Sequence, residues 1–277
     1  MSRETRAQDL FASSQLFVSD FDNTVALTFE KSPNGIGVDE AYNMAITEMF
    51  GVQALEEYQG RGGLRNRAPI EVVGELAAPA NDRELNDLTD ELNEKRLGML
   101  MKEIGVRFPD GSMWPRLTKG YVEFYDKMKN GGGSNQHVTD IILSSGHEQF
   151  IEKTYEVYGL DRPTHIFAEE TARQLATEVS VDIAKLTKPS PILMMVMYNL
   201  WRQDHSIPAL SIDAPIPFDD RDRIIYVGDD PKKDGELAEG SNVRFKLIDR
   251  VNSATSWQDV TLRLQLGQTA LIGVGSE

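Results

Sequence analysis

Short apolar runs alternate with longer segments of helical period along most of the chain. Runs of β-branched and aromatic residues that end in polar loops predict strands. The clearest of these cover residues 16–19, 138–143 and 223–227, and two weaker ones cover residues 165–168 and 243–248. Strands that alternate with helical segments are typical of an α/β fold built on a parallel sheet.

Residues 36–110 have a different pattern from the rest of the chain. The segments 38–50 and 81–104 look helical, and strand-like runs are few. The stretch "FPDGSMWP", which follows closely, combines proline, aspartate and glycine, as expected of a hinge. We therefore predict an all-helical insert at residues 36–110, within a core formed by residues 1–35 and 111–277.

The length and composition fit a soluble protein with one core and a smaller insert. The chain has 277 residues, of which 40% are hydrophobic and 26% are charged. Its apolar stretches are shorter than a membrane span, and the first residues, "MSRETRAQDL", lack the apolar centre of a secretion signal. We expect a cytoplasmic protein without a membrane partner. The absence of cysteine excludes disulfides, thiolate catalysis and cysteine-ligated metals.

The charge balance restricts the class of ligand. A formal net charge of −15 argues against a nucleic-acid binder, which normally presents a basic face. The same acidity repels anionic substrates at long range. A phosphorylated substrate therefore requires cationic side chains close to its binding site.

Polar side chains follow three of the predicted strands. Asp20 and Asp22 end the run "LFVSDFDNT", Ser144 and Ser145 end "IILSSGH", and Asp229 follows "RIIYVG". Each could be an ordinary loop residue, because aspartate and serine commonly cap turns. Ligands of open α/β sheets, however, bind beyond the carboxyl ends of the strands. We expect these residues to meet in one crevice.

Two further groups of charged residues have no simple structural explanation. Lys188 precedes two prolines and an apolar helix, where its charge opposes the helix dipole. Asp229, Asp230 and Asp234 place three acids within six positions, and these repel one another unless a cation or a lysine holds them. Capping of the following helix accounts well for Asp234 and poorly for the adjacent pair.

The order of these motifs resembles the haloacid dehalogenase-like hydrolase superfamily over nearly the whole chain. The superfamily's four motifs match "DFDNT", "ILSSG", "TKP" and "GDDPKKD" in this sequence. The resemblance implies a Rossmann-like three-layer core and a mobile cap formed by the helical insert. It also implies Mg²⁺ as cofactor, with Asp20, the backbone carbonyl of Asp22, and Asp229 as ligands.

The residue types suit phosphoryl transfer. A carboxylate can take a phosphoryl group as an acyl phosphate, and Asp20 stands at the strand end where the nucleophile is expected. Asp22, two residues on, points in a similar direction and can act as the acid and base. Mg²⁺ prefers oxygen ligands and can bridge to a phosphate.

The resemblance assigns the supporting roles as well. Ser144 is expected to bind a phosphoryl oxygen, and Lys188 to neutralise charge on Asp20 and the phosphate. Asp234 is expected to position Lys188 or the metal loop. Two alternatives stay open: Ser145 in place of Ser144, and Asp230 sharing the role of Asp229.

Within the helical insert, the stretch "EYQGRGGLRNRAP" is unusually basic for so acidic a chain. A glycine-containing turn lies at a similar place in the caps of relatives such as beta-phosphoglucomutase. We therefore expect Gly60 and Arg61, together with Arg65 or Arg67, to contact an anionic substrate. The alternative is a solvated loop whose arginines pair with nearby glutamates.

The sequence thus predicts a Mg²⁺-dependent phosphatase that hydrolyses a small phosphorylated metabolite through an aspartyl phosphate. The acid at Asp22 argues against a dehalogenase, because a halide leaving group needs no proton. One alternative is a phosphomutase of the beta-phosphoglucomutase type, and another is a non-catalytic protein that binds phosphorylated ligands. We expect a monomer or homodimer. The proline-rich segment 202–222 is a lid, an interface or a plain loop, and its position between the third and fourth motifs is compatible with a place near the crevice.

Overall fold

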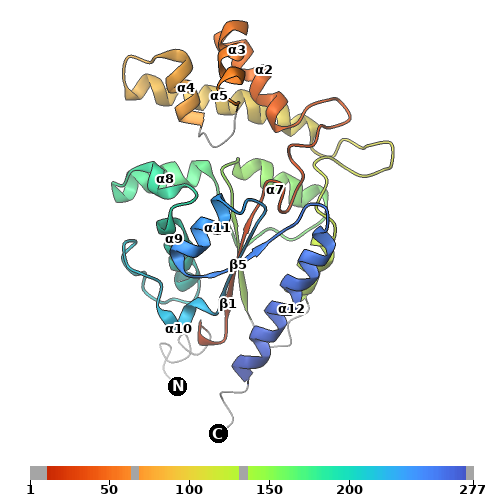
Figure 1. Cartoon of the computed structure of the whole chain (residues 1–277), viewed down its shortest axis with the longest axis vertical. Coiled ribbons are helices and arrows are strands. Elements are labelled where there is room, and N and C mark those ends of the chain that lie inside the picture. The colour runs from red at the N-terminus through yellow and green to blue at the C-terminus, as the bar shows by residue number, and fades with distance from the viewer. Residues whose placement is uncertain (1–10, 64–68, 131–136, 273–277) are drawn as a thin grey trace. The chain divides into compact units, whose positions relative to one another are not determined.

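The computed structural model describes residues 11–63, 69–130 and 137–272 (Figure 1). The chain divides into two compact units. The first unit comprises Met1–Ala26, Leu117–Glu148 and Asp161–Glu277, and the second comprises Leu27–Arg116 and Gln149–Leu160.

The described part of the first unit contains a five-stranded parallel sheet in the order β3-β2-β1-β4-β5. All the strands predicted from the sequence are present, with ends that differ by at most one residue. The strands are β1 (Gln15–Asp20), β2 (Val138–Leu143), β3 (His165–Phe167), β4 (Ile224–Gly228) and β5 (Arg244–Leu247). The predicted α/β fold with a parallel sheet is therefore confirmed.

Helices cover both faces of this sheet, and Figure 1 shows α9 and α11 on one side and α12 on the other. On the first face, buried residues of α9 such as Met194 and Met197 pack with Leu16 and Val18 of β1. On the opposite face, the rings of Phe17 and Phe124 lie 5.1 Å apart. The helices of this unit are α6 (Tyr121–Asn130), α8 (Glu169–Val179), η1 (Ile183–Leu186), α9 (Pro191–Asp204), α10 (Phe218–Arg221), α11 (Lys233–Ser241) and α12 (Ser253–Ile272).

The sequence of α9 explains both its start and its burial. Pro191 occupies the first helical turn, where a proline costs no hydrogen bond. Eight of the residues that follow are buried, including Met195 and Trp201, so the helix is apolar on most of its surface. This is the pattern of a helix packed in the core of a protein.

The segment 202–222 packs at the end of the sheet where the strands begin, away from their carboxyl ends. Asn199 of α9 pairs with the backbone of Leu210 in both directions, at 2.9 Å each. Ile216 is buried, and Arg223, just before β4, donates hydrogen bonds to the Ser14 carbonyl and the Asp220 carboxylate. The segment covers the core at this end of the sheet. The expectation that it could lie near the crevice is therefore wrong.

The second unit is built around a group of helices. They are α2 (Val38–Phe50), α3 (Val52–Gly60), α4 (Pro69–Ala77) and α5 (Asp82–Glu103), and the unit also contains most of α7 (Glu148–Val157). The α5 helix begins after Asn81, whose side chain accepts a hydrogen bond from the Glu84 amide at 3.1 Å. In the interior, the Arg96 guanidinium lies over the Tyr42 ring, 4.4 Å from its centre.

The helical segments predicted at 38–50 and 81–104 correspond to α2 and α5. The predicted insert, residues 36–110, falls inside the second unit, which also includes flanking residues and part of α7. Its role as a mobile cap stays a prediction. Within the described ranges, none of the helices combines the length and the apolar character needed to cross a bilayer.

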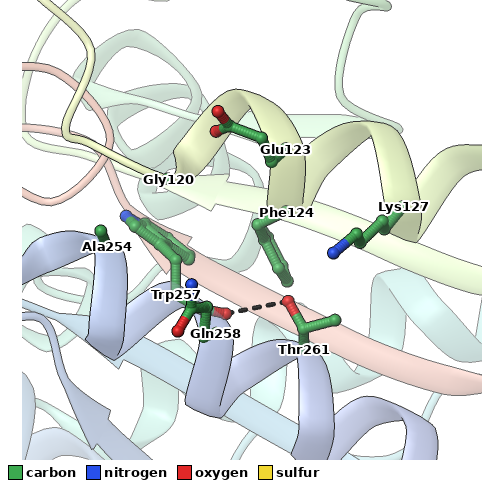
Figure 2. A pocket seen from close by; sticks show the side chains of 8 residues that line it. All are labelled: Gly120, Glu123, Phe124, Lys127, Ala254, Trp257, Gln258 and Thr261. Atoms are coloured by element: carbon green, nitrogen blue, oxygen red, sulfur yellow. Dashed lines mark hydrogen bonds between the residues drawn. The ribbon is translucent and has the colours of Figure 1, made fainter.

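A pocket of about 220 Å³ lies between α6 and α12 in the first unit (Figure 2). Phe124 and Trp257, whose rings stack 4.8 Å apart, contribute to its wall. Gly120 stands at its edge with a φ of +89°, and a Cβ there would lie 2.9 Å from the Cα of Ala254. Glycine therefore permits both the backbone turn and the close approach of the loop before α6 to α12.

We expect Gly120→Ala to lower the free energy of unfolding by about 1–3 kcal/mol, because it combines a strained φ with a backbone clash. Urea denaturation of the purified variant measures this change. Gly235→Ala in α11 is the matched control, since its Cβ would lie 3.8 Å from Phe245 in open helical geometry. The control should be as stable as the parent or slightly more stable. Equal stability of the Gly120 variant and the parent would contradict the argument.

Candidate active site

The parallel register brings the strand-end residues to one edge of the sheet. Asp20 is the last residue of β1 and pairs with Leu143, so Ser144 follows directly beside it. Ser19 pairs with Val227 of the neighbouring strand β4, and Asp229 is the first residue after that strand. The structure thus brings together the first, second and fourth sequence motifs, as the crevice prediction requires.

Lys188 joins this group from the loop between η1 and α9. Its ammonium donates a hydrogen bond to Asp20 Oδ1 and lies 2.9 Å from Asp234 Oδ1. The second oxygen of Asp20 accepts a hydrogen bond from Thr24 Oγ1 at 3.2 Å. The side chains of Lys188, Asp20 and Asp234 are 14%, 11% and 2% exposed, so the ion pairs are largely shielded from water.

Burial and charge oppose each other in this cluster. Burial raises the pKa of Asp20, with Lys188 acting against that shift and Asp234 adding to it. Burial alone would lower the pKa of Lys188, but the neighbouring Asp20, Tyr226 and Asp234 hold that pKa well above its usual value. Lys188 is therefore a permanent cation at the strand ends, placed against the carboxylate predicted to be the nucleophile.

Asp22 and Ser144 interact directly on the other side of the loop after β1. Ser144 Oγ donates to Asp22 Oδ2 at 3.1 Å and accepts from the Gly146 amide at 2.9 Å. Asn23 has a φ of 59°, a left-handed conformation that asparagine tolerates, and it turns the chain just after Asp22. Ser144 is buried, whereas its neighbour Ser145 is exposed.

The loop after β4 arranges three acids in three different environments. Asp230 Oδ1 accepts hydrogen bonds from the backbone amides of Lys232 and Lys233, at 2.8 and 3.1 Å, so this carboxylate organises the loop. Asp234 accepts from the Asp230 amide at 3.1 Å and from the hydroxyl of Tyr226. Asp229 lies 3.8 Å from Arg250, and burial, followed by the charge of Asp234, raises its pKa to about 6.

Gly228, between β4 and these acids, has no room for a side chain. A Cβ at this position would lie 2.2 Å from Asp234 Oδ2. The glycine therefore lets the Asp234 carboxylate lie against the strand end and reach Lys188.

The donor set fits a divalent cation. Oxygen atoms of Asp20, Asp229 and Asp234 all lie within 4.8 Å of one another. Asp234 is already bound by Lys188, Tyr226 and an amide, which leaves Asp20 and Asp229 to contribute ligands. One or two carboxylates match the preference of Mg²⁺, which takes oxygen ligands and keeps several waters.

Two features of the site were not singled out by sequence reasoning. Tyr226, which binds Asp234, looked like one more apolar strand residue; its only signal was a hydroxyl two positions before Gly228. His147, the last residue of the stretch "IILSSGH", is buried and its Nδ1 lies 2.6 Å from Glu170 Oε1 of α8. Burial would raise the pKa of Glu170, but the contact with His147 and backbone amides hold it below its usual value.

The predicted substrate residues of the helical insert belong to the second unit. Gly60 ends α3 in the second unit, and Arg61 forms ion pairs there with Glu57 and with Glu75, the latter at 3.0 Å. These pairs match the alternative of a solvated basic loop more closely than a free anion-binding arginine. Arg65 and Arg67 lie outside the described residues.

Comparison with known proteins yields structural similarity only. No protein-family model matches the chain, and no curated protein matches it. A beta-phosphoglucomutase from Clostridium difficile has 11% identity and a TM-score of 0.49, with 93% of this chain and 98% of that chain covered. A hydrolase from Pseudomonas syringae has 13% identity and a TM-score of 0.47, with 89% and 99% covered.

A haloacid dehalogenase-like family hydrolase from Xanthomonas campestris has 14% identity and a TM-score of 0.43, with 93% and 95% of the two chains covered. The solved structures similar to this chain thus include haloacid dehalogenase-like hydrolases and a phosphoglucomutase.

Proposed function

We propose that this protein is a Mg²⁺-dependent phosphatase that acts on a small phosphorylated metabolite through an aspartyl phosphate on Asp20. The observation that carries the proposal is the buried Asp20 carboxylate at the end of β1, bound by Lys188 and flanked by the Asp22–Ser144 pair. A protein that only binds phosphate has no need of a second carboxylate beside the first. A hydrolase needs both, one to attack and one to move a proton.

In the first step, an oxygen of Asp20 attacks the phosphorus atom of the ester. The Asp20–phosphorus bond forms as the bond to the leaving oxygen breaks, and that oxygen takes the electron pair. Asp22 donates a proton to the leaving oxygen. In the second step, water attacks the phosphorus, the bond to Asp20 breaks, and Asp22 receives the proton that the water loses.

Lys188 neutralises negative charge as Asp20 and the phosphoryl group approach each other. Its position is held by Asp234, which Tyr226 and the Asp230 amide in turn hold in place. Preorganised charge of this kind commonly supplies the largest part of catalysis in phosphoryl transfer.

Ser144 is oriented to hold a phosphoryl oxygen, since its hydroxyl already lies beside Asp22 and is supported by the Gly146 amide. Its burial, against the exposure of Ser145, favours Ser144 for this role. Asp20 and Asp229 would hold Mg²⁺, together with the Asp22 carbonyl that the motif resemblance implies. When bound, the ion offsets repulsion between the carboxylates and the phosphate.

We expect the protein to release inorganic phosphate from a panel of small phosphate esters in Mg²⁺ and to lose this activity in a chelator. Asp20→Asn should lower kcat by roughly 10³-fold or more, because it removes the nucleophile. Asp213→Asn, the same chemical change at an exposed residue in the segment 202–222, should leave the rate unchanged. A colorimetric phosphate assay, without any sugar acceptor, measures all three.

Phosphate release without an acceptor separates the phosphatase from a mutase, which passes the phosphoryl group to a second hydroxyl. Folded protein that turns over no ester with or without an acceptor would overturn the proposal and favour the binding protein.

We expect the effect of Asp22→Asn to depend on the leaving group. An alkyl phosphate such as glycerol 2-phosphate needs a proton on its leaving oxygen, so its kcat should fall by roughly 10²- to 10⁴-fold. Formation of the aspartyl phosphate from p-nitrophenyl phosphate should change much less, because nitrophenolate leaves without a proton. Burst kinetics of nitrophenolate release measure that first step. Equal losses in the first step for both esters would rule out Asp22 as the acid.

A further inference from the structure

Arg250 lies beside the candidate metal ligands and has no role in the proposed mechanism. β5 pairs with β4 so that Leu247 lies opposite Gly228, and the Ile248 amide donates to the Gly228 carbonyl at 2.9 Å. The loop after β5 therefore leaves the sheet at the same edge as Asp229. Arg250 Nε lies 3.8 Å from Asp229 Oδ2, and its side chain is 59% exposed.

The loop does not need Arg250 for its own structure. Asp249 Oδ1 accepts from the Val251 amide at 2.9 Å, and the Asn252 side chain donates to Asp249 Oδ2 at 2.9 Å. The Asp249 amide donates to Ser256 Oγ at 3.2 Å, which ties the loop to α12. The contact of Arg250 with Asp229 is longer than a hydrogen bond, and exposed pairs of this kind add little stability.

Charge balance changes at this position when the site is loaded. Once Asp229 binds a divalent cation, that cation and the Arg250 guanidinium are two positive charges next to one carboxylate, and they repel each other. An anionic group placed beside Arg250 removes that repulsion. The phosphoryl group reacts at Asp20, which already has Lys188 as its cation, so an anion beside Arg250 would be a second one.

We propose that Arg250 binds a second anionic group of the substrate, so that the substrate is a phosphate ester carrying a carboxylate or a second phosphate near the ester. A guanidinium takes either group through two parallel hydrogen bonds. This inference rests on the proposed function and names its substrate class. In a chain of net charge −15, an exposed arginine beside Asp229 gives an anionic substrate a local point of attraction.

The test uses matched ligands that differ in the second anion. The carboxylate pair is 2-phosphoglycerate and glycerol 2-phosphate, and the phosphate pair is fructose 1,6-bisphosphate and fructose 6-phosphate. Binding is measured by titration calorimetry on Asp20→Asn protein in Mg²⁺, so that turnover is not required. Arg250→Ala should weaken binding of the doubly anionic member of at least one pair, 2-phosphoglycerate or fructose 1,6-bisphosphate, by roughly 10- to 100-fold. It should change binding of the counterpart that has only one phosphate less than about twofold.

Arg244→Ala is the matched control variant. Arg244 is the first residue of β5, the strand whose other end leads to Arg250. It is also exposed and pairs with Asp222 at 2.8 Å. This variant should bind all four ligands as the parent does. Arg250→Lys keeps the charge and loses the paired hydrogen bonds. Its affinity for the two ligands with a second anion should fall between those of the parent and of Arg250→Ala.

The outcomes separate this inference from the proposed function. Binding of an anionic ligand that depends on Arg250, in a protein that hydrolyses no ester, would support the inference and overturn the phosphatase. Hydrolysis by wild-type protein, with ligand binding in which Arg250→Ala and Arg244→Ala behave alike, would overturn the inference and leave the phosphatase standing. Failure of both 2-phosphoglycerate and fructose 1,6-bisphosphate to bind at millimolar concentration would also overturn the inference.

Discussion

The ion pairs of Lys188 with Asp20 and Asp234 connect residues that are more than forty positions apart in the chain, and the candidate site depends on them. Burial removes the water that would otherwise stabilise these charges, so each carboxylate needs a cationic or hydrogen-bonded partner nearby. Lys188 satisfies two of the three acids. Asp229 keeps a pKa raised to about 6, which is the electrostatic reason for expecting a divalent cation beside it. The same repulsion that makes this cluster costly for folding makes it suited to hold a metal ion.

The geometry that brings these charges together comes from the sheet and from single small residues. Because β1 lies between β2 and β4 in a parallel sheet, the chain leaves all three strands at one edge, with Asp20 in the middle. Gly228 then lets Asp234 fold back against the strand end, and the Tyr226 hydroxyl holds it there. Asn23 turns the chain so that Asp22 meets Ser144. Each of these residues is ordinary by itself, and the site forms because the three strands end at one edge of the sheet.

Electrostatics also connects the acidic character of the chain with its proposed ligand. At a net charge of −15, an anion approaches this protein against a repulsive field, and affinity must come from a few cations at the site. Lys188 is buried and paired with Asp20, so in the proposed mechanism it would neutralise charge on the reacting phosphoryl group. Arg250 is exposed and loosely paired, so it is available to a part of the substrate that does not react. These two cations would divide catalysis from recognition.

The sequence alone determined the strands, the parallel α/β class, the helices α2, α5 and α9, and the motif residues at the strand ends. These follow from local periodicity, from turn residues and from the rule that ligands bind where parallel strands end. It left open whether Asp234 positions Lys188 or the loop that carries Asp229, and it could not show that Asp230 binds backbone amides, because all three are acids in one short loop. Nor could it show that the segment 202–222 lies at the opposite end of the sheet, or that Arg61 is paired with Glu57 and Glu75. The partners and burial of these side chains, and the end of the sheet at which a segment packs, depend on residues distant in sequence. Only the tertiary structure decided them.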